Sequence, residues 1–124
     1  MKSAEIEVSF QIWGSFSQKE IEDTLKLKAD RFYITRAGNP IWEITTGLSS
    51  SEGIEIEISK IMSRFQKRQK NLITLKKSIP NIEYVVDIRI NTYNQYYPAL
   101  VLMNKALRWS GKIGADIGIS IYDY

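Results

Sequence analysis

The sequence predicts an α+β protein: a mixed or antiparallel sheet with helices packed on one face, as a variant of the ferredoxin-like fold. Several segments alternate apolar and polar residues with the two-residue period of half-buried strands, and others repeat apolar residues at helical spacing. Amphipathic strands favour such a sheet, because one face is left polar while helices cover the other. With 124 residues, the chain can build one core, so residues 1–124 are interpreted as a single domain.

The first part of the chain is expected to form a strand, a short helix and a hairpin. Residues 5–12 alternate as a strand does. Ser17 to Glu20 have the spacing of a capping box, in which a serine and a glutamate satisfy the first free amides of a helix. Residues 31–36 and 41–46 read as strands on either side of the turn-forming residues 37–40, which predicts a hairpin.

The middle of the chain is expected to be helical. In residues 54–65, isoleucines alternate as in a strand, but apolar residues also recur at helical spacing. Acidic residues near the start and basic residues near the end suit the helix dipole, so a helix is predicted. A second apolar stripe runs up to Pro80, which stops it. The sequence leaves open whether one long helix passes through the polar residues 66–71 or two helices meet there.

The last part alternates strand and helix patterns. Residues 82–91 predict a long strand, residues 99–103 an apolar and extended segment that could form a short strand, and Asn104 a cap for a final helix. Ile117, Ile119 and Ile121 then alternate with polar residues and Gly118. We expect this final segment to be a central strand, with something packed closely against the bare backbone of the glycine.

Composition removes several classes of function. The chain has no cysteine and no histidine, so it lacks a disulfide, a thiolate, the usual general base and the commonest transition-metal ligand. We therefore expect no enzyme, no metal and no cofactor; catalysis would have to rely on Asp, Glu, Lys, Arg, Tyr or Ser alone, and glycosidases with paired carboxylates are one such type. The net charge of +3 does not demand nucleic acid. The short apolar runs and the polar start predict a cytoplasmic protein without a membrane span.

Two groups of residues are candidates for binding a partner protein. A basic cluster on the predicted helices could meet an acidic surface, although a solvated helix face is the commoner explanation. Tyrosines in the loop after residues 82–91 could anchor an interface or fold back onto the core; base stacking is a third and weaker alternative. The candidates are Lys60, Arg64, Lys67, Arg68, Lys70, Tyr93, Tyr96 and Tyr97. Trp13, Trp42 and Trp109 could line a ligand pocket but more often fill a core.

A set of short motifs runs along nearly the whole chain. These are the strand Phe10-Gln11-Ile12-Trp13-Gly14, a helix from Ser17 that contains Glu20-Ile21, a Trp-x-Ile-Thr-Thr strand from Trp42, a helical pair before Pro80, and the ending Ile-Gly-Ala-x-Ile-x-Ile-x-Ile-Tyr over residues 113–122. With these motifs the chain resembles the uncharacterised bacterial family known as domain of unknown function 4279. The ending is the most specific of them.

The resemblance implies a small stand-alone cytoplasmic protein without known catalytic residues. Some members of the family look like immunity proteins of polymorphic or contact-dependent toxin systems, which bind a cognate toxin and block it. We therefore expect a cognate toxin domain as the partner; the sequence also allows a homodimer. The alternative is a small-molecule-binding or regulatory domain that uses the uncovered face of the sheet and the tryptophans.

Overall fold

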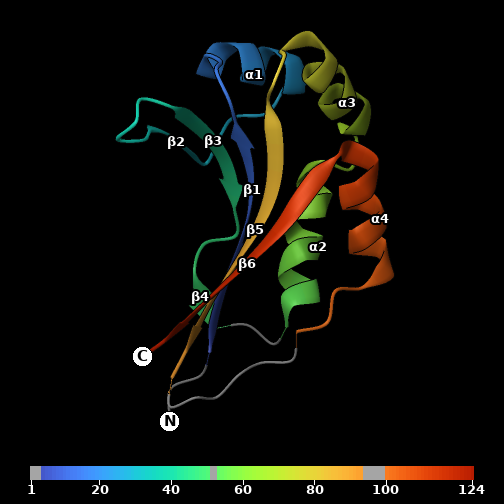
Figure 1. The fold of residues 1–124 in the computed structure, drawn as a ribbon. Coiled ribbons are helices and arrows are strands. Elements are labelled where there is room, and N and C mark those ends of the chain that lie inside the picture. The colour runs from blue at the N-terminus through green and yellow to red at the C-terminus, as the bar shows by residue number, and fades with distance from the viewer. Residues whose placement is uncertain (1–3, 51–52, 94–99) are drawn as a thin grey trace.

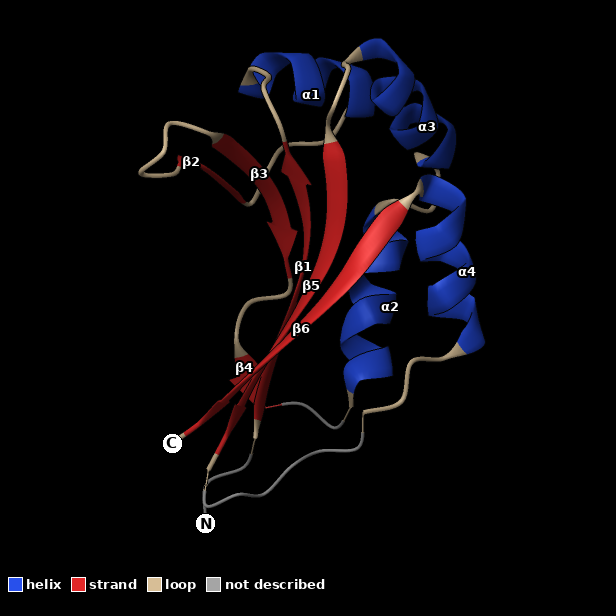
Figure 2. Cartoon of the chain, viewed as in Figure 1, coloured by secondary structure: helices blue, strands red, loops and turns tan. Residues whose placement is uncertain are grey.

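The chain folds into one twisted sheet with helices beside it, as seen in a computed structural model that describes residues 4–50, 53–93 and 100–124 (Figures 1 and 2). In chain order the elements are β1 (Glu5–Trp13), α1 (Gln18–Leu25), β2 (Arg31–Ile34), β3 (Pro40–Thr45), β4 (Ser49–Ser50), α2 (Ile54–Arg64), α3 (Gln69–Ser78), β5 (Glu83–Thr92), α4 (Asn104–Ile113) and β6 (Ala115–Asp123). None of the helices in these ranges has both the length and the hydropathy that a membrane span needs.

The strand order confirms an α+β fold with a mixed sheet. The order is β2-β3-β1-β5-β6, and the two-residue β4 pairs with the start of β1. Strand β1 is antiparallel to both β3 and β5, whereas β6 is parallel to β5. Apart from the two-residue β4, and with α2 and α3 together in the place of one helix, the part from β1 to β5 follows the strand–helix–strand–strand–helix–strand order of a ferredoxin-like fold. Helix α4 and strand β6 extend this arrangement at one edge.

The local signals for α1 and α2 are confirmed. Ser17 accepts a hydrogen bond from the Glu20 amide at 3.1 Å, and the Glu20 side chain accepts one from the Ser17 amide at 3.0 Å, which completes the capping box at α1. The segment from residue 54 is a helix, as predicted. The alternative that the sequence left open is decided in favour of two helices, because α2 ends at Arg64 and α3 begins at Gln69.

The core lies between the sheet and the helices, which share one face of the sheet (Figure 2). Phe10 of β1 is at its centre, with ring centroids 4.7 Å from Phe65, 5.3 Å from Tyr84 and 6.2 Å from Trp109. These side chains come from β1, β5, α4 and the turn after α2. Full burial of one such side chain stabilises the fold by about 1.5–3 kcal/mol. The alternation along β1 and β5 therefore correctly predicted which side chains point inward.

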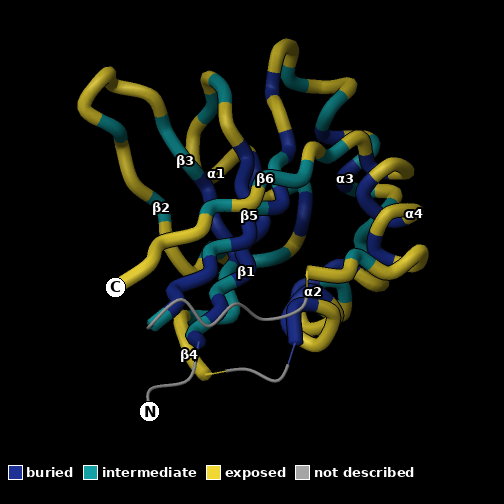
Figure 3. The backbone as a smooth tube through the Cα atoms, turned by 60° about the horizontal axis from the view of Figure 1, so that its bottom comes forward, coloured by how far each residue is buried: buried dark blue, intermediate teal, exposed yellow. Residues whose placement is uncertain are grey.

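The expected central position of the final strand is wrong. Strand β6 pairs only with β5 and is an edge strand of the described sheet. Strand β5 is the inner strand, since it pairs with β1 on one side and with β6 on the other. Helix α4 returns the chain to the starting end of β5, so β6 runs parallel to β5. In Figures 1 and 3, β6 diverges from α4 toward the C-terminus and loses its cover. Ile119 and Ile121 are each 43% exposed as a result.

Three smaller expectations around β6 and α4 also need correction. A Cβ atom on Gly118 would lie 3.7 Å from Asp87 Oδ1, an ordinary contact, so the glycine is not required by close packing. Leu100 to Met103, the described part of the predicted extended segment, pair with no strand that the structure describes. Asn104 is the first residue of α4 and Met103 occupies the cap position, without a capping side chain.

Candidate functional site

Some residues of the basic cluster form contacts within the chain, and others are exposed without an ion pair to the described residues. Lys60 pairs with the buried Glu57 at 2.8 Å, one turn earlier on α2. Arg64 pairs with Asp30 at 3.3 Å and so ties α2 to the segment before β2. Both cations are thus already engaged within the chain, which reduces the charge that they can offer to a partner.

Arg68 has a structural role that the sequence pattern did not indicate. Its guanidinium donates to the carbonyls of Leu25, Lys26 and Arg64 at 3.1, 3.2 and 3.1 Å. These groups include carbonyls at the end of α1, where the last turn leaves acceptors without helical partners. Lys67 and Lys70 remain exposed, and neither has a recorded ion pair with the described part of the chain. These two lysines are therefore the open members of the cluster.

Of the three candidate tyrosines, the structure describes Tyr93. Its hydroxyl donates to the Glu5 carboxylate, and its ring stacks on Tyr124 with centroids 5.6 Å apart. Tyr93 is thus held against β1 and the end of the chain. Tyr96 and Tyr97 lie outside the described residues, and their role stays a prediction.

An apolar edge is exposed close to this tyrosine pair. Thirteen large apolar side chains are exposed in the described ranges, and eight of them belong to residues 100–124. We call these eight the C-terminal edge: Leu100, Val101, Met103, Leu107, Ile119, Ile121, Tyr122 and Tyr124. They fall into two groups, Leu100 to Leu107 before and within α4 and Ile119 to Tyr124 along β6. Exposed apolar side chains that gather on a surface usually mark interaction sites. Among the described strands β6 pairs with β5 alone, so its outer side is an edge to which a strand of another chain could be added.

The other face of the sheet, the open face, carries no helix among the described residues and is crossed by a polar network. Gln11 is central: it accepts from the Trp13 indole at 2.8 Å and donates to Glu43 at 2.7 Å. Arg31 reaches Glu7 at 2.5 Å and lies 3.3 Å from Glu43 Oε1. That buried oxygen accepts no aligned hydrogen bond from the described residues, so its contact with Arg31 is a charge contact alone. The network links β1, β2 and β3.

Asp87 of β5 lies on the same face, opposite Ser9 of β1 and Gly118 of β6. Burial raises the pKa of the Asp87 carboxyl above its ordinary value, and the negative charge of Glu7 raises it further. Burial likewise raises the pKa of the Tyr33 hydroxyl, with Glu43 as the next contributor. No three acidic side chains of the described ranges are grouped so that they could hold a metal ion.

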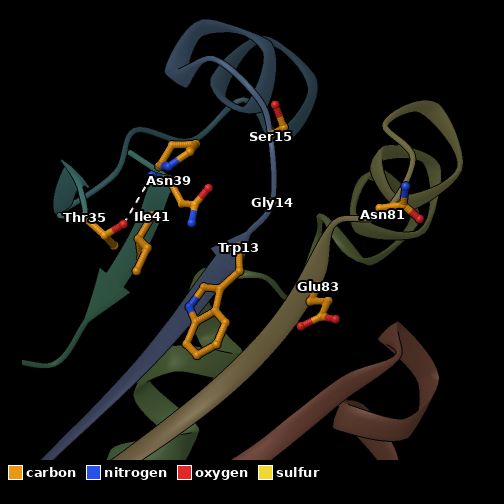
Figure 4. Close-up of a pocket in the computed structure, with 9 residues that line it drawn as sticks. Trp13, Gly14, Ser15, Thr35, Asn39, Ile41, Asn81 and Glu83 are labelled. Atoms are coloured by element: carbon orange, nitrogen blue, oxygen red, sulfur yellow. Dashed lines mark hydrogen bonds between the residues drawn. The ribbon is translucent and has the colours of Figure 1, made fainter. Parts of the chain in front are cut away.

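A pocket of about 520 Å³ opens where β1 ends and β3 and β5 begin (Figure 4). Trp13, Gly14 and Ser15 form one wall, and Asn81 and Glu83 form another. The hairpin contributes Thr35, Asn39, Pro40 and Ile41. We call this cavity the Trp13 pocket. It contains none of the eight candidate residues, although the sequence did contain a signal: Ile12 points into the core, so Trp13 must point outward.

The three tryptophans thus have different roles. Trp42 is fully buried on the covered face, where its indole donates to Glu22 at 3.2 Å, and Trp109 belongs to the aromatic core. Both follow the commoner expectation for tryptophan. Trp13 is 42% exposed and lines the pocket.

The fold and these surfaces describe a small α+β domain with an exposed apolar edge and a pocket. Residues 4–124 match the family described as "Domain of unknown function (DUF4279)", and the chain belongs to this family. The match covers all of the described elements and confirms the resemblance seen in the sequence. Comparisons with curated proteins and with solved structures gave no significant match.

Proposed function

We propose that the chain is an immunity protein that binds a cognate bacterial toxin, of a polymorphic or contact-dependent system, and neutralises it by covering its active surface. It acts by binding and catalyses no reaction. The observation that carries the proposal is the C-terminal edge, where eight large apolar side chains of residues 100–124 are exposed, four of them within or directly after the edge strand β6. Family membership alone leaves the function open, since the family is described only as one of unknown function.

The C-terminal edge has the properties of a protein-binding surface. An edge strand can add a strand of the partner through main-chain hydrogen bonds, and side chains beside it then determine specificity. Aromatic residues are enriched among the residues that dominate binding energy, and Tyr122 and Tyr124 both lie here. Tyr96 and Tyr97 lie outside the described residues, and their contact with the partner stays a separate prediction.

The two open lysines have a different part in this proposal. Lys67 lies just before α3 and Lys70 is its second residue. Neither lysine forms an ion pair with another described residue. Exposed charges mainly raise the association rate with an oppositely charged partner. Reversal of both lysines should therefore slow association at low salt and leave dissociation nearly unchanged.

Two carboxylates of the open face, Glu7 and Glu43, fit a structural role better than a catalytic one. Glu7 accepts from Arg31 and from the Thr45 hydroxyl, and Glu43 accepts from Gln11. Acids held in this way lack a free partner for proton transfer. With no imidazole or thiol in the sequence, recognition is the function that these side chains support.

The test is binding and protection with the product of the neighbouring toxin gene. The purified chain should bind that product in calorimetry, and co-expression should restore growth of cells that make the toxin. Ile121→Asp places a charge on the C-terminal edge and should weaken binding by more than about tenfold, a loss of about 1.4 kcal/mol. Ile34→Asp is the matched control, because Ile34 is also an exposed strand isoleucine and its strand β2 is at the opposite edge of the sheet from β6.

Two outcomes would contradict the proposal. One is that the neighbouring product neither binds nor is neutralised. The other is equal weakening by the two aspartate variants, which would remove the C-terminal edge as the contact. Sedimentation at several concentrations distinguishes a toxin-binding edge from one that joins two copies of the chain.

A second candidate function is small-molecule binding, and the Trp13 pocket favours it. The volume of about 520 Å³ lies within the range of about 300–1,000 Å³ that is usual for ligand sites. Melting of the chain with a metabolite panel and with the toxin separates the two functions. A rise in the melting temperature with a metabolite alone supports a small-molecule sensor.

A further inference from the structure

The Trp13 pocket is built on one row of side chains that crosses three strands. In the sheet register, Trp13 of β1 is opposite Ile41 of β3 on one side and opposite Glu83 of β5 on the other. Directly opposite residues project from the same face, with Cβ atoms about 4.5–5.5 Å apart. Figure 4 shows the indole between the hairpin residue and the glutamate. The floor of the pocket is therefore an apolar side chain, an aromatic ring and a carboxylate, in that order.

The indole of Trp13 is fixed in position before any ligand arrives. Its Nε1 donates to Gln11 Oε1 at 2.8 Å, and Gln11 is in turn held by Glu43 at 2.7 Å. The ring nevertheless stays 42% exposed, so part of it remains available to a ligand. A fixed aromatic surface binds at a lower entropic cost than one that must be ordered.

The charge of the pocket is negative although the chain as a whole is positive. The net charge is +3, but none of the lining residues is a lysine or an arginine, and Glu83 is the charged residue among them. Glu83 is exposed and has no recorded ion pair with the described residues. Its carboxylate is thus free to meet a cation.

Amide side chains complete the polar part of the lining. Asn81 has a left-handed backbone with φ of 65°, and it lines the pocket beside Glu83. Asn39 lines it from the hairpin, where its backbone amide donates to Thr35 Oγ1 at 3.2 Å. The carbonyl oxygens of these amides can accept N–H groups of a ligand. An anion would find no basic side chain in this lining.

We propose that the Trp13 pocket binds a guanidinium or alkylammonium group. The cation would lie against the Trp13 ring, attracted by its negative face, and would pair with Glu83. The aliphatic part of the ligand would contact Ile41. The cation can come from a free small molecule or from an arginine or lysine on a partner protein, since both present the same chemistry. This proposal does not rest on the toxin proposal, because small probes test it.

The experiment uses a charged probe and its neutral isostere. N-acetylarginine amide and N-acetylcitrulline amide have nearly the same shape, but only the first is a cation. We expect the arginine probe to change the fluorescence of the exposed Trp13 and to bind in calorimetry. The citrulline probe should bind at least about tenfold more weakly, which corresponds to about 1.4 kcal/mol.

Variants locate the binding within the pocket. Glu83→Gln keeps the shape and removes the charge, and it should weaken the arginine probe by about tenfold. Trp13→Leu should abolish the fluorescence change and weaken binding, whereas Trp13→Phe should retain part of the affinity because it keeps an aromatic ring. Glu55→Gln removes a similar exposed carboxylate from α2, away from the pocket, and should leave binding unchanged. Thermal melting confirms that each variant is folded.

Equal binding of the two probes, or equal binding by the wild type and Glu83→Gln, would overturn the proposal. The source of the cation follows from a second arm with the toxin. If Glu83→Gln weakens toxin binding as well, the cation is a side chain of the partner. If it weakens the arginine probe alone, the cation is a free small molecule, and the pocket is a ligand site separate from the C-terminal edge.

Discussion

Strands β5 and β6 carry the same alternation of isoleucines and bury them to very different extents. Ile88 of β5 is 0% exposed, whereas its register partner Ile119 of β6 is 43% exposed. Both point toward the side of the sheet that carries the helices. The difference comes from position, because β5 lies between two strands and beneath the helices, while β6 is an edge strand that diverges from α4 (Figure 1).

This difference separates two kinds of information in a sequence. The period of two tells which face a side chain is on, but burial depends on what the topology places above that face. Where the apolar pattern continues without cover, its side chains contribute little to the core. An apolar row at an uncovered edge is therefore a candidate surface for contact with another molecule.

The sharpest test of this comparison is a pair of alanine substitutions on the two partner residues. Ile88→Ala should lower the free energy of unfolding by about 2–4 kcal/mol, because it removes buried groups and leaves a cavity. Ile119→Ala should lower it by less than about 1 kcal/mol, because the side chain is already close to half exposed. Urea unfolding of the wild type and both variants measures the two values.

Equal losses for the two variants would show that β6 is covered in solution. In that case the cost of Ile119→Ala should rise with protein concentration, as it does when a second copy supplies the cover. Independence from concentration, together with equal losses, would contradict the comparison itself.

Much of the fold could be predicted because its signals are local. The capping box at Ser17, the turn between β2 and β3 and the stop at Pro80 each depend on a few adjacent residues. The alternation in β1 and β5 also correctly assigned their inward faces. The break between α2 and α3 could not be predicted, since it depends on Phe65 filling the core and Arg68 binding the end of α1.

The candidate sites were harder to predict because they depend on register. Gln11, Arg31 and Glu43 come from three strands, and only their pairing makes one network. The Trp13 pocket likewise needs β3, β1 and β5 side by side. Among the basic residues, charge alone could not distinguish Arg68, which binds backbone carbonyls, from the open Lys67 and Lys70.

The open face of the sheet also holds a buried charge, the Glu43 carboxylate, whose cation is Arg31. Arg31→Met leaves Glu43, whose side chain is 5% exposed, without its cation and should destabilise the fold by about 1–2 kcal/mol. The value is below that of a fully buried pair because the Arg31 side chain is 52% exposed. Chemical unfolding at neutral pH measures it.

The control for this prediction is an ion pair in full contact with water. Lys19→Met breaks the pair between Lys19 and Asp23 on α1, whose side chains are 85% and 64% exposed, and should change stability by no measurable amount. Adding Glu43→Gln to Arg31→Met should recover part of the lost stability, because the buried charge is removed as well. Failure to recover would mean that the loss comes from packing or from the pair of Arg31 with Glu7, and not from the buried charge of Glu43.

The smallest expected change in stability concerns the acidic residues of β5 and β6. Asp87 of β5 has a pKa raised by burial and then by Glu7, so the folded chain holds this proton more tightly than the unfolded chain. The resulting stability is fully present below the ordinary aspartate value of 3.8 and is lost as the pH rises through the raised pKa. Asp87→Asn keeps the group neutral, so at pH 7 the variant should melt about 2 °C higher than the wild type.

This advantage of Asp87→Asn should vanish as the pH is lowered toward 3.8, where the wild-type carboxyl is also protonated. Asp116→Asn is the matched control on β6, where it removes an exposed carboxylate and should leave the melting temperature unchanged throughout. A gain for Asp87→Asn that is equal at all pH values would have to come from a new hydrogen bond of the amide. A loss at neutral pH would mean that the Asp87 carboxylate is stabilised by the open face, which would reverse the assigned role of Glu7.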